Sequence, residues 1–89
     1  MTEIRRHIHF YGRVQGVGFR YKAKYMAQSL GLTGWVRNEW DGTVSMELQG
    51  RSVLIDKLLE GLNNDRYISI NWMDVKEMPT EEERGFRVR

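Results

Sequence analysis

The apolar residues of this chain change their spacing four times along 89 residues, and the order of these periods constrains the fold more than any other feature. Residues 6–13 alternate apolar and polar side chains, with Ile8 and Phe10 on one face, which is the period of a half-buried strand. Between residues 19 and 30 the apolar spacing becomes three and four, and Gly31 follows as expected for a helix C-cap. The chain therefore begins with a strand, a tight loop and an amphipathic helix.

The next segments predict a hairpin. The sequence "GWVRN" runs into "EWDGTV", in which Asp41 and Gly42 suit the positive backbone dihedrals of a tight turn. The following "TVSMELQ" alternates, so three of its side chains should face the core: Val44, Met46 and Leu48. Two paired strands are therefore expected on either side of this turn.

The last third of the chain predicts a second helix and further strands. Ser52 is a plausible N-cap, and leucine and isoleucine residues follow at helical spacing until Asn63–Asn64. The stretch "YISINWMDV" predicts a strand whose alternation slips at Trp72–Met73, which indicates a bulge. The run "TEEER", residues 80–84, is expected to be an exposed loop, and "GFRVR" a short final strand.

The predicted order of elements is βαββαβ. Two strand–helix–strand units of this kind build an α+β fold of the ferredoxin-like sandwich type, a mostly antiparallel sheet with both helices on one face. We find no repeat or linker, and 89 residues suit one small core. Residues 1–89 are therefore expected to form a single domain.

The composition indicates where such a domain works. The chain has no cysteine, so packing alone must hold the fold, as suits a reducing compartment. The N-terminal residues lack the continuous apolar run of a signal peptide, and no segment reaches the about 18 apolar residues that span a bilayer. A cytoplasmic protein without a membrane partner is the expectation.

The charges are unevenly distributed along the chain. Residues 1–37 hold seven lysines and arginines against one acid, Glu3, whereas residues 38–89 hold seven against eleven acids. A local excess of positive charge on an almost neutral protein favours a small anionic ligand over a long nucleic-acid footprint. The first part of the chain is therefore where we look for a binding site.

The stretch "GRVQGVGFR", residues 12–20, combines glycines with positive charge. Gly12, Gly16 and Gly18 give the loop freedom to converge backbone N–H groups on an anion, and the following helix N-terminus adds unpaired donors. Arg20 falls in the first helical turn, where a cation opposes the helix dipole unless an anion lies between them. A tight turn with a solvated Arg20 explains the same spacing equally well, so both interpretations stay open here.

Other site types fit less well. The glycine spacing matches neither the Walker phosphate loop nor the dinucleotide-binding fingerprint, which argues against nucleotide hydrolysis. His7 and His9 lie two apart on a strand but have no third ligand at a suitable spacing, so no metal site and no cofactor are expected.

The sequence resembles the acylphosphatase family. The resemblance rests on "GRVQGVGFR", followed past a helix by "LGLTGWVRNEWDGTV" and "ELQG", in matching order and spacing. It implies a ferredoxin-like sandwich that hydrolyses the carboxyl–phosphate bond of acyl phosphates, a small-molecule substrate, without metal or cofactor. The small size of the chain favours a monomer. The resemblance also implies that Arg20 grips the phosphate and that Asn38 positions the attacking water. The implied phosphate-binding residues are Gln15, Gly16, Val17, Gly18, Phe19 and Arg20.

The chain departs from the family pattern at two positions. Many members have threonine where this chain has Ala23 and tyrosine where it has Arg89. The alternative to an enzyme is a non-catalytic ferredoxin-like module that binds RNA or an acyl phosphate. Against RNA, the aromatic motif of RNA-recognition domains is absent, so no nucleic-acid partner is expected.

Overall fold

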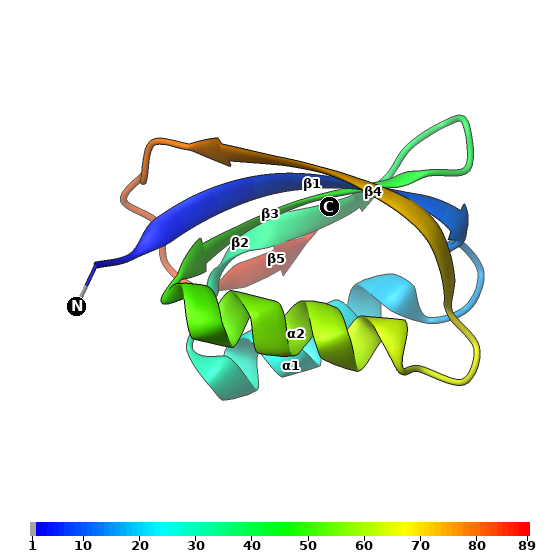
Figure 1. The fold of residues 1–89 in the computed structure, drawn as a ribbon, viewed down its shortest axis with the longest axis horizontal. Helices are drawn as coiled ribbons and strands as arrows, with labels where there is room; N and C mark the ends of the chain where they lie inside the picture. Colours follow the sequence, from blue (N-terminus) through cyan, green and yellow to red (C-terminus); the bar gives the residue numbers. More distant parts are fainter. Residues whose placement is uncertain (1) are drawn as a thin grey trace.

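The computed structural model describes residues 2–89, and its two helices lie side by side on one face of a five-stranded sheet (Figure 1). The elements are β1 (Ile4–Arg13), α1 (Phe19–Leu30), β2 (Thr33–Asn38), β3 (Val44–Gly50), α2 (Ser52–Asn63), β4 (Ser69–Met78) and β5 (Phe86–Val88). Neither helix of the described chain is long and apolar enough to cross a membrane. The predicted α+β sandwich with both helices on one face is therefore confirmed.

The strands lie in the order β4-β1-β3-β2-β5. The four longer strands are antiparallel to their neighbours, as predicted. The short β5 instead runs parallel to β2, with Phe86 opposite Gly34, so the complete sheet is mixed. A parallel partner becomes possible because the segment after β4 crosses back to the far edge before β5 begins.

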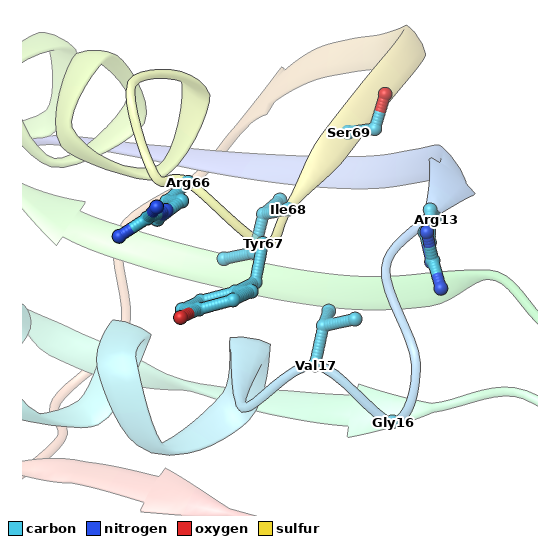
Figure 2. Close-up of a pocket in the computed structure, with 7 residues that line it drawn as sticks. All are labelled: Arg13, Gly16, Val17, Arg66, Tyr67, Ile68 and Ser69. Carbon is cyan, nitrogen blue, oxygen red and sulfur yellow. The ribbon is translucent and has the colours of Figure 1, made fainter.

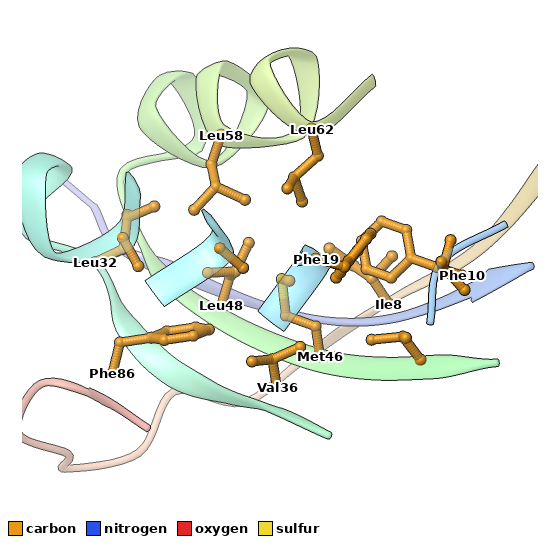
Figure 3. Close-up of a cluster of buried hydrophobic side chains, with 14 of the residues drawn as sticks. Ile8, Phe10, Phe19, Leu32, Val36, Met46, Leu48, Leu58, Leu62 and Phe86 are labelled. Atoms are coloured by element: carbon orange, nitrogen blue, oxygen red, sulfur yellow. The ribbon is translucent and has the colours of Figure 1, made fainter. Parts of the chain in front are cut away.

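Rows of apolar side chains across the sheet form the core. Met46 of β3 pairs with Ile8 of β1 and with Val36 of β2, and all three side chains are fully buried. Figure 3 shows these residues facing Leu58 and Leu62 of α2. Each such burial contributes about 1.5–3 kcal/mol before entropy is counted, so the predicted alternation is what holds the two layers together.

The ends of the helices agree with the predictions in one case and differ in another. Gly31 caps α1 in the left-handed conformation at φ 71°, and its N–H approaches the last carbonyls of the helix. Helix α2 already begins at Ser52, and the N-cap is Arg51, without a side-chain hydrogen bond. The expectation that Ser52 is the N-cap is wrong because β3 ends at Gly50, which leaves Arg51 as the single connecting residue.

The predicted bulge lies one residue earlier than expected. Tyr11 pairs with Trp72 but Gly12 pairs with Ile70, so Asn71 is the extra residue on β4. Gly12 has φ 131°, and a Cβ there would collide with the carbonyl oxygen of Ser69. Gly12 therefore permits the close approach of β1 and β4. The prediction that Gly12 shapes the loop is wrong, because this glycine lies within β1.

A buried arginine fixes the connection between β4 and β5. Arg5 is 1% exposed, and its guanidinium pairs with Glu47 and with Glu83, each at 2.8 Å. Gln49 adds hydrogen bonds to the backbone of Glu81 at 2.7 and 2.8 Å. Residues 80–84 form the exposed loop that the sequence predicts, except that these long-range contacts leave the Glu83 side chain only 9% exposed.

We predict that Glu47→Gln destabilises the fold more at neutral than at acidic pH. Burial raises the pKa of Glu47, but hydrogen bonds with His7 and Arg5 outweigh it and hold this pKa below its ordinary value. The stability that the charged Glu47 adds is complete above the ordinary carboxyl pKa and is lost as the pH falls through the lowered pKa. The free energy of unfolding in urea should fall by about 1–3 kcal/mol at pH 7.

The difference in unfolding free energy between the wild type and Glu47→Gln should become smaller toward pH 3. The matched control is Glu77→Gln on β4, whose carboxylate makes no ion pair within residues 2–89. An equal loss of stability at both pH values would contradict the assignment.

Candidate active site

The loop between β1 and α1 depends on two glycines in the left-handed conformation. Gly16 has φ 72° and Gly18 has φ 78°. A Cβ at either position would meet no atom within 4 Å, so glycine is needed here for the backbone conformation and not for space. Val14 is fully buried and anchors the start of the loop in the core.

The N-terminus of α1 is open to a ligand. Gly18 is the N-cap, no side chain caps the helix, and no acidic residue lies in the first turn. The N–H of Lys22 bonds to the carbonyl of Gly18 at 3.0 Å, so the N–H groups of residues 19–21 precede the first bond of this helix. These donors and the helix dipole favour an anion at this end.

Arg20 is half-buried beside these donors. Its Nη1 donates to the carbonyl oxygen of Arg89 at 3.3 Å, and it makes no ion pair within residues 2–89. The N–H of Arg89 bonds to the Val36 carbonyl at 2.8 Å, and its guanidinium lies 4.7 Å from the centre of the Trp35 ring. The end of the sheet thus orients Arg20 through a backbone carbonyl.

No sequence pattern predicts this contact with Arg89. Arginine stands here where many acylphosphatases have tyrosine, but the contact to Arg20 uses the main chain, which any residue supplies. Ala23, the other departure, lies on the core-facing side of α1 and is fully buried. Neither difference removes Arg20 or Asn38.

Asn38 occupies the last position of β2 and pairs with Val44. Its side-chain oxygen Oδ1 is buried and has no hydrogen-bond partner within the described chain. A buried carbonyl oxygen without a partner costs about 1–3 kcal/mol of stability. Such an atom is an acceptor held ready for an O–H or N–H group from outside the chain.

These groups share one small cavity of about 200 Å³. It is lined by Val14, Gly16, Gly18, Phe19, Arg20, Tyr21 and Asn38. The structure therefore brings together four of the six predicted phosphate-binding residues with Asn38. Two of the predicted residues, Gln15 and Val17, do not line it.

Gln15 is directed toward the β2–β3 hairpin. Its Nε2 donates to the carbonyl oxygens of Glu39 and Thr43 at 2.7 and 2.9 Å. The side-chain amide is thus engaged within the protein, and only the backbone of Gln15 remains to contact an anion. The side chain ties the loop to the hairpin that begins directly after Asn38, a positioning contact that spacing alone does not indicate.

The hairpin turn itself is held by Asp41. The hydroxyl and the N–H of Thr43 both donate to its Oδ1, at 2.6 and 3.1 Å. These bonds hold the pKa of Asp41 below its ordinary value, so the carboxylate stays charged further into the acidic range. His9 bonds to the same Thr43 hydroxyl at 2.7 Å.

Chemically, the cavity offers a permanent cation, several backbone donors and one buried acceptor. A tetrahedral anion with several oxygens suits the donors and the planar guanidinium of Arg20. The acceptor at Asn38 suits a polar hydrogen near that anion. The arrangement therefore fits a phosphoryl group together with a water molecule.

Comparison with known proteins agrees with this chemistry. A family model described as acylphosphatase matches residues 6–88. An acylphosphatase from Bifidobacterium longum is 44% identical over 97% of this chain and 92% of its own. The solved structures of acylphosphatases from Coxiella burnetii and Bacillus subtilis superpose with TM-scores of 0.89 and 0.88, at 34% and 31% identity. The superposition with the Coxiella burnetii protein covers 98% of this chain and 93% of that protein, and the one with the Bacillus subtilis protein covers 97% and 98%. The chain belongs to the acylphosphatase family.

Proposed function

We propose that this enzyme hydrolyses acyl phosphates in the cavity between the β1–α1 loop and the end of β2. Water adds through its oxygen to the phosphorus atom, and the bond from phosphorus to the acyl oxygen breaks. The electron pair of that bond leaves with the carboxylate, and the products are a carboxylate and dihydrogen phosphate. Atoms and charge balance without a further reactant.

The phosphoryl group is proposed to lie against the start of α1. Backbone N–H groups of residues 16–20 and the Arg20 guanidinium face the non-bridging oxygens, where negative charge is greatest in the transition state. The anion then separates Arg20 from the positive end of the helix. This relieves the conflict that a cation in the first turn otherwise creates.

Asn38 is proposed to position the attacking water, and its unpartnered Oδ1 is the observation that carries the proposal. A carbonyl oxygen accepts one O–H of the water and directs the water oxygen toward phosphorus. A neutral amide is a poor base, so the water proton passes to a phosphate oxygen. The carboxylate leaves readily without a general acid, which agrees with a cavity lining that has no carboxyl or imidazole group.

We further propose a monomer that works in the cytoplasm on a small molecule. The core is assembled from the helices and strands of one chain. The lack of cysteine suits a reducing compartment. The charge excess near the loop, on a nearly neutral protein, suits a small anion.

We predict that Arg20→Ala lowers kcat/KM for benzoyl phosphate by at least about 10³-fold, the scale of losing an arginine from a phosphoryl transition state. Initial rates are measured in EDTA, because the lining of the cavity contains no typical metal-binding side chain. The control, Lys24→Ala, removes a cation from the same helix outside the cavity and should retain activity. A wild-type protein inactive on several acyl phosphates would contradict the function.

We predict that Asn38→Ala lowers kcat by about 10²–10³-fold and leaves KM nearly unchanged, since the water is not part of substrate binding. Because the variant removes a buried oxygen that has no partner, it should not lose stability in urea unfolding. The control is Asn63→Ala at the exposed end of α2. Wild-type turnover by a folded Asn38→Ala protein would rule out the positioning role.

A further inference from the structure

A second, larger cavity of about 480 Å³ adjoins the first (Figure 2). It is lined by Arg13, Gly16, Val17, Arg66, Tyr67, Ile68 and Ser69. Gly16 lines both cavities, so they meet at the loop that is proposed to hold the phosphoryl group. The volume is in the range of small-molecule sites. The proposed hydrolysis uses no side chain of this second cavity.

The charge of the second cavity is positive. Arg13 and Arg66 are exposed and lie on opposite sides of it in Figure 2, with Val17 and the Tyr67 ring between them. Neither arginine makes an ion pair in the part of the chain that the structure describes. No acidic residue belongs to the lining. The cavity thus offers two cations and apolar surface, without a competing carboxylate.

The wall that carries Arg66 is held in place. The carboxylate of Asp65 accepts hydrogen bonds from the N–H groups of Tyr67 and Ile68 at 2.8 and 3.2 Å. The same carboxylate pairs with Lys22 of α1, and this pairing lowers the pKa of Asp65. The α2–β4 connection is therefore fixed to the helix that carries the phosphate site, so the two cavities keep a constant relation.

We propose that the second cavity binds the acyl part of the substrate and favours acyl groups that carry a second negative charge. This inference rests on the proposed function, because it places the phosphoryl group on one side of Gly16 and the acyl chain on the other. Val17 and Ile68 provide apolar surface for the methylene groups, and Arg13 and Arg66 attract the terminal anion. The preferred substrates are therefore acyl phosphates of dicarboxylic acids or of acids that carry a second phosphate group.

The test compares succinyl phosphate with butyryl phosphate. The two substrates have the same carbon-chain length, and only succinyl phosphate ends in a carboxylate. We expect the wild-type kcat/KM, corrected for uncatalysed hydrolysis, to be at least about fivefold higher for succinyl phosphate at low ionic strength. Added salt should reduce this ratio, because it screens exposed charges.

Variants of the two arginines test whether this cavity produces the preference for succinyl phosphate. Arg13→Gln and Arg66→Gln should each lower the ratio by about two- to fivefold, and the double variant should bring it to about one while leaving butyryl phosphate hydrolysis nearly unchanged. The matched control, Arg84→Gln, removes the same charge from an exposed residue outside this cavity and should keep the ratio. Circular dichroism checks that each variant is folded.

Two outcomes would overturn this proposal alone, and a third would overturn the proposed function as well. A wild-type ratio of one or less, or a double variant that keeps the wild-type ratio, would contradict recognition by this cavity while butyryl phosphate hydrolysis still supports the acylphosphatase assignment. A wild-type protein that hydrolyses neither substrate would overturn the proposed function and this inference with it.

Discussion

The pairing of β3 with both β1 and β2 is the constraint on which the candidate site depends. Val44 lies opposite Phe10 of β1 and opposite Asn38 of β2, so these three residues share one level and one face of the sheet. Phe10 in turn packs edge-on against Phe19 of α1, with ring centres 4.9 Å apart. The alternation of β3 thus places Asn38 at the start of α1, and a shift of one residue would turn it to the opposite face.

Three departures from ordinary stabilising patterns meet in this small region. Gly18 caps a helix without a side-chain hydrogen bond, Arg20 puts a cation in the first turn, and Asn38 buries an acceptor without a partner. Each departure costs stability by itself. In the function we propose, a bound phosphoryl group and a positioned water would satisfy all three together. Such a local loss of folding stability is expected at a functional site, because selection acts there on function as well as on folding.

Features that depend on neighbouring residues were predictable from the sequence. The apolar periods predicted both helices, the hairpin and the buried faces of β1, β3 and β5. The loop motif pointed to Arg20, the resemblance to acylphosphatases implied Asn38, and both residues line one cavity. Features that depend on distant residues were not predictable. Gly12 must be glycine because Ser69 of β4, far along the chain, lies against it. The Glu83 side chain is shielded because it pairs with the buried Arg5. The parallel pairing of β5 likewise follows from the path of a long connection, and no local pattern encodes it.

The two cavities that meet at Gly16 divide the work between backbone and side chains. In the function we propose, main-chain N–H groups and one arginine bind the phosphoryl group, which is common to every acyl phosphate. The acyl group is proposed to contact side chains instead, and two of these, Arg66 and Tyr67, lie in the α2–β4 connection, which no strand pairing constrains. Substitutions there can change the preferred acyl group without moving Arg20 or Asn38. Separating the two tasks lets one scaffold keep its chemistry while its substrate preference varies.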